Sequence, residues 1–199
     1  MNKLLIATNN KGKVSELQEL LKGTGIQLLT PADIGLSLEV DEDGETYAEN
    51  SSKKAIAFAQ ASGLISLADD SGLEVDALDG APGLYSARYS PKTAANDADR
   101  REFLLQNLND KPRPWKAHFH ATIAIAKSSG EVELAEGNCF GEIIPVERGS
   151  GGFGYDPIFF LSELNKTMAE LGMGEKNRIS HRALAVMNVM PIVKKMFGL

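Results

Sequence analysis

Features that mark secreted, membrane-spanning or nucleic-acid-binding proteins are scarce in this sequence. Among 199 residues Cys139 is the one cysteine, which excludes a disulfide within the chain and suits a reducing cytoplasm. No apolar run approaches the ~20 residues that span a bilayer, and Met1 to Lys3 lead directly into a short strand, so we expect neither a signal peptide nor a membrane partner. A formal net charge of −6 argues against nucleic acid as a partner.

The remaining composition is that of an ordinary globular chain. Hydrophobic residues make up 43% and charged residues 24% of the sequence, and there is no internal repeat or low-complexity tract. A chain of this length forms one domain, or one domain with two lobes. The acidic net charge does not exclude a phosphate ligand, because a local cluster of lysines, arginines and backbone N–H groups can bind an anion.

Two adjacent carboxylates follow an apolar, strand-like run that ends at Ala68. At the end of a strand the chain turns, so we expect Asp69 and Asp70 to reach one cleft. Their oxygens suit Mg²⁺, especially where a substrate supplies phosphates. Gly72, after Ser71, lets the backbone leave the strand. The alternative is a solvated turn, since Asp, Ser and Gly are the commonest turn residues.

A second polar stretch, residues 9–13, separates a predicted strand over residues 3–8 from a predicted helix. The start of a helix directs unpaired N–H groups and the positive end of its dipole at an anion, and Lys11 and Lys13 add charge. The pattern is not the Walker motif, which requires Gly-x-x-x-x-Gly-Lys-Ser/Thr. A capped helix with solvated lysines explains the same residues, so both interpretations stay open here.

An acidic run at residues 39–45 precedes a capping-box pattern. Thr46 and Glu49 are spaced to satisfy each other's backbone donors, which predicts a helix that begins here and runs to about Ala61. Lys53 follows Glu49 by four residues and shares its face. Its side chain either pairs with Glu49 or reaches into a cleft.

Glycines surround two aromatic residues and an aspartate at residues 149–157. Glycines let a backbone approach a ligand closely, and Phe153 can lie flat against a base. The alternative is a flexible hairpin loop, although two aromatics and an X-Pro bond are unusual in a flexible linker. Further along, Ser180 is a natural N-cap that places His181 and Arg182 at the start of the last helix.

Taken together, four motifs resemble those of the inosine triphosphate pyrophosphatase family (dITP/XTP pyrophosphatases). The resemblance covers essentially the whole chain, with the motifs in the right order and spacing. One mild departure is Asn9, where many relatives carry glycine. The motifs are Thr8-Asn9-Asn10-x-x-Lys13, residues 68–73, residues 151–157 and Ser180-His181-Arg182. Further matches lie at residues 42–46, at Glu49-Asn50 and at residues 80–88.

The resemblance implies a fold and an activity. The expected fold is α/β, with a long central mixed β-sheet, flanking helices and two lobes around a substrate cleft, in a single pyrophosphatase domain over residues 1–199. The expected activity is hydrolysis of aberrant purine nucleoside triphosphates (ITP, dITP, XTP) to the monophosphate and pyrophosphate. The resemblance also implies Mg²⁺ as cofactor and a homodimer.

Carried over by position, the family's roles fall on particular residues. Glu42 and Asp70 would ligate Mg²⁺, and Asp70 would also act as the base. Asp69 and Lys53 are further catalytic candidates, and the residues alone do not tell which of the adjacent carboxylates takes a proton. The residues that would bind substrate are Thr8, Asn9, Asn10, Lys11, Gly12, Lys13, Ser71, Phe153, Gly154, Tyr155, Asp156, Lys176, His181 and Arg182.

Base choice requires more than stacking. We expect Phe153 to stack on any purine, whereas cationic donors from Lys176, His181 or Arg182 would read the 6-keto oxygen of hypoxanthine and xanthine. Two other functions fit the same residues. One is a related pyrophosphatase acting on modified pyrimidine or methylated nucleotides. The other is a nucleotide-binding regulatory protein without turnover.

Overall fold

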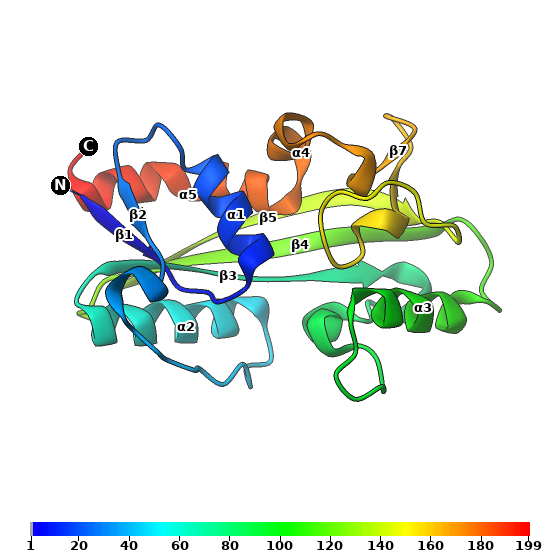
Figure 1. Cartoon of the computed structure of the whole chain (residues 1–199), viewed down its shortest axis with the longest axis horizontal. Coiled ribbons are helices and arrows are strands. Elements are labelled where there is room, and N and C mark those ends of the chain that lie inside the picture. The colour runs from blue at the N-terminus through cyan, green and yellow to red at the C-terminus, as the bar shows by residue number, and fades with distance from the viewer. Residues whose placement is uncertain (1) are drawn as a thin grey trace. The chain divides into compact units, whose positions relative to one another are not determined.

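The computed structural model describes residues 2–199, so the part of the signal-peptide prediction that rests on Met1 lies outside the described residues (Figure 1). The chain divides into two compact units, and each is described by itself. Unit 1 comprises residues 1–70, 121–137 and 181–199. Unit 2 comprises residues 71–120 and 138–180. The predicted substrate cleft between two lobes stays a prediction.

The strands form one mixed sheet in the order β2-β1-β3-β4-β5-β6-β7. Strand β1 pairs in parallel with β2 and β3, whereas β6 pairs antiparallel with β5 and β7. This arrangement confirms the predicted α/β class with a mixed sheet and flanking helices. The strands are β1 (Lys3–Ile6), β2 (Gln27–Leu29), β3 (Ile65–Val75), β4 (Trp115–Ala126), β5 (Val132–Ile143), β6 (Phe159–Leu161) and β7 (Lys166–Thr167).

Helices cover both faces of the strands in unit 1 (Figure 1). Helices α1 (Lys11–Leu20) and α5 (His181–Phe197) share one apolar cluster with Leu4 and Ile6 of β1. Helix α2 (Tyr47–Ser62) packs on the other face, against Leu5 and Ala7. The alternation of successive side chains in β1 therefore assigns each helix its own side of the sheet.

Unit 2 has a separate core. Helix α3 (Asp97–Leu108) inserts Leu104 and Leu108 into a cluster with residues of β3, β4, β5 and β6. The short helix α4 (Met173–Ile179) was not predicted from the sequence. Unit 1 contains the short 3-10 helix η1 (Ala32–Ile34). Unit 2 contains the 3-10 helices η2 (Asp76–Leu78), η3 (Gly83–Arg88), η4 (Asp156–Ile158) and η5 (Met168–Glu170).

The polar residues before α1 and α2 cap these helices. The Asn10 side chain accepts a hydrogen bond from the Lys13 N–H at 3.0 Å, and Thr46 accepts one from the Glu49 N–H at 3.1 Å. The Glu49 carboxylate accepts from the Glu45 N–H instead of the Thr46 N–H. One half of the predicted capping box is therefore confirmed, and the other half is shifted by one residue.

The structure corrects the prediction that the chain turns at residues 69–72. Strand β3 is continuous from Ile65 to Val75, and Asp69 and Asp70 lie in its middle. The physical reason is that the strand's place in the sheet sustains the extended backbone through Ser71 and Gly72, whose types alone favour a turn.

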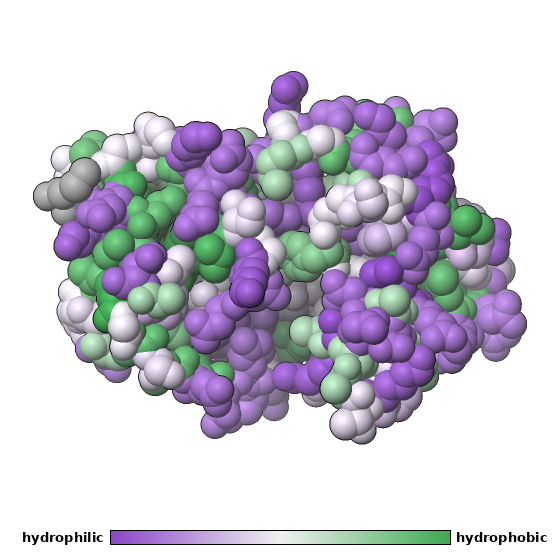
Figure 2. Space-filling view, viewed as in Figure 1, coloured by the Kyte–Doolittle hydropathy of each residue, from purple (hydrophilic) through white to green (hydrophobic). Residues whose placement is uncertain are grey.

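No helix within residues 2–199 is long and apolar enough to cross a membrane. Figure 2 shows hydrophilic side chains interspersed with hydrophobic residues over β1, β2 and α1 of unit 1. Scattered apolar residues of this kind are normal on a protein surface.

Candidate active site

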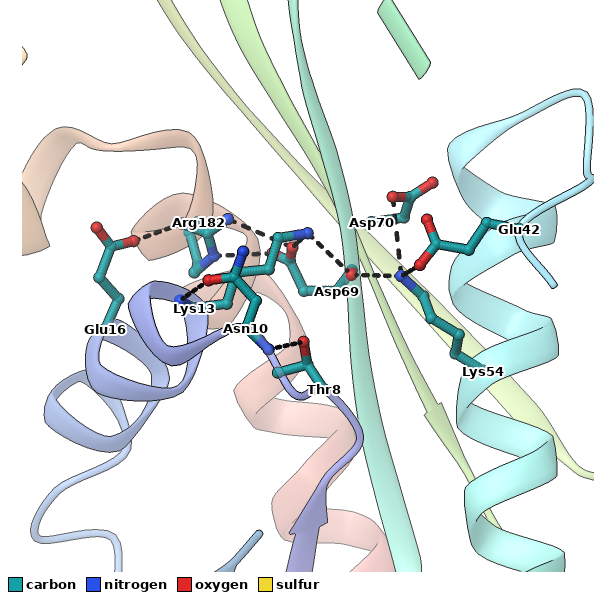
Figure 3. A network of polar contacts seen from close by, with 9 residues as sticks. All are labelled: Thr8, Asn10, Lys13, Glu16, Glu42, Lys54, Asp69, Asp70 and Arg182. Carbon is teal, nitrogen blue, oxygen red and sulfur yellow. Dashed lines mark hydrogen bonds and ion pairs between the residues drawn. The ribbon is translucent and has the colours of Figure 1, made fainter. Parts of the chain in front are cut away.

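Asp69 and Asp70 lie on opposite faces of β3 (Figure 3). Leu67 belongs to the cluster under α1 and α5, and Ala68 belongs to the cluster under α2. Because side chains alternate along a strand, Asp69 follows Leu67 to the α1/α5 face and Asp70 follows Ala68 to the α2 face. The expectation that both carboxylates reach one cleft from a turn is therefore wrong.

Asp69 is buried among cations from two helices. Arg182 Nε of α5 lies 2.9 Å from Asp69 Oδ2, and Lys13 Nζ of α1 lies 2.6 Å from Asp69 Oδ1. Burial alone would raise the pKa of Asp69, but Arg182 and Lys13 outweigh it and hold this pKa well below its usual range. The ionised form of Asp69 is thus favoured at neutral pH.

Arg182 itself is buried between two carboxylates. Besides Asp69, its guanidinium pairs with Glu16 of α1, which is also buried. Burial opposes the charged form, yet these two carboxylates raise the pKa of Arg182. The structure places His181, also buried, as the first residue of α5 beside it in sequence. That Arg182 or His181 reads the base stays a prediction.

Asp70 has the opposite electrostatic character. Lys54 Nζ of α2 lies 3.8 Å from Asp70 Oδ1 and 3.0 Å from Glu42 Oε1. Burial, together with the nearby Glu42 and Asp69, raises the pKa of Asp70, while Lys54 and Lys13 only partly oppose the shift. A buried carboxylate with a raised pKa is a candidate proton acceptor.

The backbone of Asp69 connects the two faces. Directly after β1, the Ala7 N–H donates to the Leu67 carbonyl of β3 at 2.8 Å. Two residues on, the Asp69 carbonyl points to the same edge and accepts from Lys54 Nζ at 3.0 Å and Lys13 Nζ at 3.3 Å. Burial, with help from Arg182 and Lys54, lowers the pKa of Lys13 despite its partner Asp69.

The loop before α1 folds back on itself at this edge. Thr8 Oγ1 accepts from the Asn10 N–H at 3.2 Å, and the Asn10 cap then starts the helix. Lys11, Gly12 and Lys13 form its first turn, and the N–H groups of a first turn have no carbonyl acceptor within the helix. A pocket of about 390 Å³ adjoins the loop, and its lining includes Thr8, Asn9, Asn10, Glu42 and Lys54.

Lys54, which the sequence analysis missed, contacts Glu42 and Asp70, whereas Lys53 makes a different contact from the Glu49 pair that was one of its two expected roles. The Lys53 side chain is 47% exposed and pairs with Asp43 at 2.6 Å. Helical spacing carries the signal that distinguishes them, because Lys54 lies three residues after Ser51 and four before Phe58, both of which are buried. Glu16 was missed as well, although it lies one turn after Lys13 on α1.

The Gly-rich loop (residues 149–157) gathers the predicted residues of unit 2. Asp156 accepts from the Phe153 N–H at 3.0 Å and from Lys176 Nζ at 2.6 Å, and Lys176 Nζ lies 5.4 Å from the centroid of the Phe153 ring. A side chain at Gly152, where φ is +71°, would collide with the Asp156 carboxylate, since its Cβ would lie 1.9 Å from Oδ2.

Other predicted residues of unit 2 differ in their surroundings. Tyr155 is buried and donates its hydroxyl to the Ser86 carbonyl at 2.9 Å, and burial raises its pKa, so it anchors the loop as a neutral phenol. Ser71 lies half-buried on β3, directly after Asp70 in sequence. Gly154 is bound by Asp97 and Arg101 of α3. Lys176 belongs to unit 2, whereas Arg182 belongs to unit 1.

The residues predicted to hold Mg²⁺ fit that ion. Glu42 and Asp70 both contact the ammonium of Lys54, so their carboxylates already converge on one cation. Mg²⁺ is usually held by one or two carboxylates, with substrate phosphates and water completing its shell. Within residues 2–199 no group of three or more His, Cys, Asp or Glu side chains is placed so that it could hold a metal ion.

The mixed sheet, with buried carboxylates and lysines gathered where β1 ends, defines an α/β protein that carries a polar site at a sheet edge. The chain belongs to the Ham1 family, whose sequence profile matches residues 4–192.

Relatives and solved structures cover nearly all of the chain. The dITP/XTP pyrophosphatase of Desulforamulus reducens is 48% identical over 98% of this chain and 97% of its own length. That of Geobacter sulfurreducens is 47% identical over 94% of each chain. The structure of a HAM1 protein from Coxiella burnetii superposes with a TM-score of 0.88 at 37% identity, over 98% of this chain and all of the other. The family resemblance predicted from the motifs is thereby confirmed.

Proposed function

We propose that this protein hydrolyses aberrant purine nucleoside triphosphates, ITP, dITP and XTP, to the monophosphate and pyrophosphate. Its relatives at 48% and 47% identity bear the name of this activity. The observation that carries the proposal is the contrast between two neighbouring carboxylates. Asp69 lies 2.6 Å from Lys13 Nζ and 2.9 Å from Arg182 Nε, whereas Asp70 lies 3.8 Å from Lys54 Nζ and its pKa is raised, mainly by burial. Such divergent environments separate a fixed charge from a proton acceptor.

In the proposed reaction, water attacks the α-phosphorus, and the bond from that phosphorus to the oxygen bridging to the β-phosphorus breaks. The Asp70 carboxylate takes the proton of the attacking water. Lys13 and Lys54, whose ammonium groups meet at the Asp69 carbonyl, neutralise charge that develops on the pyrophosphate leaving group. Asp69 and Arg182 keep Lys13 in place.

The cofactor and the base contacts are further parts of the proposal. Glu42 and Asp70 would hold Mg²⁺, which when bound polarises phosphate and lowers the pKa of bound water. The first turn of α1 and Thr8 would bind phosphate oxygens. Phe153 would stack on the purine. Lys176, which lies over the Phe153 ring, and Asp156, which binds Lys176, would hold that ring in place.

A substrate panel tests the activity. ITP, dITP, XTP, ATP, GTP, UTP and a modified UTP are incubated with the protein, and the products are separated by ion-exchange chromatography. The expected result is monophosphate and pyrophosphate from the first three, far exceeding the other four, with activity lost in EDTA and restored by Mg²⁺. Preference for the modified pyrimidine, release of a diphosphate, or tight binding of ITP with Mg²⁺ but no turnover would overturn the proposal.

The proposed assembly is a homodimer in a reducing cytoplasm. Light scattering measures the mass in solution, and the dimer predicts twice the chain mass of 21.4 kDa. A mass equal to that of one chain across micromolar concentrations would contradict the dimer.

A further inference from the structure

Helix α3 holds the Gly-rich loop through the backbone of a single residue. Asp97 Oδ2 accepts from the Gly154 N–H at 2.8 Å, and Arg101 Nη1 donates to the Gly154 carbonyl at 2.8 Å. The two side chains are four residues apart and therefore share one face of α3. Gly154, where φ is +62°, is thus fixed on both its donor and its acceptor side.

Each half of this contact is itself supported. Arg101 binds Glu147 through two parallel hydrogen bonds, from Nε at 2.8 Å and from Nη2 at 3.0 Å, which fixes the plane of its guanidinium. Asp97 also pairs with Arg100. Burial would raise the pKa of Asp97, but Arg100 and the Gly154 N–H outweigh it and lower the pKa, so the carboxylate stays an acceptor at neutral pH.

The consequence falls on Phe153. Its own N–H is bound by Asp156 at 3.0 Å, and the next N–H along the chain, that of Gly154, is bound by Asp97. Because a peptide unit is planar, fixing the units before and after a residue fixes its φ and ψ, and with them the direction of its Cα–Cβ bond. Two aspartates, one within the loop and one on α3, therefore set the direction in which the Phe153 side chain leaves the backbone.

We infer that Asp97 and Arg101 are positioning residues that preorganise the Phe153 ring for stacking on the base of the nucleotide. The inference rests on the proposed function, since it assigns these residues to the base side of that site. Neither residue contacts the reacting phosphates in this account. We call the two contacts of Asp97 and Arg101 with Gly154 the clamp. Without the clamp, Phe153 would be present but free to turn away, so the binding of every purine nucleotide should weaken to a similar degree.

Kinetics of single variants give the first test. Asp97→Ala should raise the KM for ITP about 5- to 30-fold, with kcat within about twofold, because a lost stack weakens ground state and transition state alike. It should also raise the inhibition constant of inosine monophosphate but not that of pyrophosphate, which has no base. The matched control is Asp99→Ala, which removes the capping-box partner of Asn96 on the same helix turn without touching Gly154, and its KM should stay within about twofold.

A double-mutant cycle gives the sharper test. If Asp97 acts through Phe153, adding Asp97→Ala to Phe153→Ala should change KM by less than about twofold. Additive losses, an unchanged KM in Asp97→Ala, or an unchanged KM in Phe153→Ala would each overturn the inference. Should Asp97→Ala not fold, Arg101→Ala takes its place in the same cycle, and Arg101→Lys, which keeps one donor, should recover part of the affinity.

A measurement without turnover separates this inference from the proposed function. Hydrogen exchange at the Gly154 amide should accelerate at least tenfold in Asp97→Ala and stay unchanged in Asp99→Ala. If the unaltered protein releases no pyrophosphate, the proposed activity fails, and the clamp is then judged by this exchange and by inosine monophosphate affinity. Unchanged exchange, or unchanged affinity for inosine monophosphate, would overturn the inference on its own.

Discussion

Both units contain ion pairs and main-chain contacts, but the buried row of charges in unit 1 and the Gly-rich loop of unit 2 depend on them to different degrees. In unit 1, charged side chains hold one another, as Glu16, Arg182 and Asp69 do in a buried row. In unit 2, the Gly-rich loop is held through main-chain atoms, at the N–H of Phe153 and at both polar atoms of Gly154. Charge pairing sets ionisation states, whereas backbone clamping sets shape. Under the proposed function, unit 1 would carry the catalytic groups and unit 2 the residues that recognise the base.

The largest expected effect comes from removing the proton acceptor of unit 1. Asp70→Asn should lower kcat for ITP by ~10²–10⁴-fold with little loss of folding stability, because the amide keeps the shape but not the basicity. Steady-state pyrophosphate release and a urea unfolding curve measure the two quantities. Turnover near that of the unaltered protein would remove Asp70 from its proposed role and with it the division of labour between the units.

The next effect concerns stability. Arg182→Ala would leave two buried carboxylates, Glu16 and Asp69, without their shared cation, and should cost ~3–5 kcal/mol of unfolding free energy. Urea denaturation followed by circular dichroism measures the change. Glu147→Ala, which removes the partly exposed partner of Arg101 in unit 2, is the contrasting variant and should cost less than ~1 kcal/mol. Equal losses would contradict the difference drawn between the units.

Adjacent lysines on α2 offer a matched pair. Lys54→Ala should lower kcat/KM for ITP by ~10–100-fold, since it removes a cation shared by Glu42, Asp70 and the Asp69 carbonyl. Lys53→Ala removes only an exposed ion pair and should stay within about twofold. The reverse ranking would restore Lys53 to the role that the sequence suggested.

The smallest effect is a labelling profile in unit 2. Burial, aided by Asp156 and opposed by Lys176, raises the pKa of the Cys139 thiol to about 11. The reactive thiolate is therefore scarce below that pH, and iodoacetamide labelling of the folded protein should rise steeply only above about pH 10. In urea the inflection should return to about 8.5, the usual thiol value. An inflection near pH 8.5 in the folded protein would show that the Cys139 thiol is accessible to solvent and would contradict its burial.

Local patterns allowed much of the fold to be predicted. The first strand, the polar loop and the capped helix after it depend on neighbours in sequence, and β1, Asn10 and α1 match that prediction. The turn expected at residues 69–72 was wrong because pairing in the sheet overrode local turn preference. Helix α5 continues past Pro191, a residue type that kinks or ends many helices.

The partners of the site residues were harder to predict than the residues themselves. Asp69 and Arg182 are 113 positions apart, and Glu16 and Arg182 are 166 apart, so no periodic pattern relates them. The choice between Lys53 and Lys54 required knowing which face of α2 meets the sheet. Spacing around Ser51 and Phe58 contained that information, whereas the pairing of Arg182 with Glu16 required the fold.

The anchor shared by Lys13 and Lys54 is a main-chain oxygen, and this affects how the protein tolerates change. Genetic substitution alters side chains, but every residue placed at position 69 brings a carbonyl at the same point of β3. The carbonyl at which the two ammonium groups meet is therefore set by the path of the strand and not by the type of side chain at position 69. An allele that alters the acidic side chain would lose the ion pair to Lys13 but would keep the carbonyl that both lysines share.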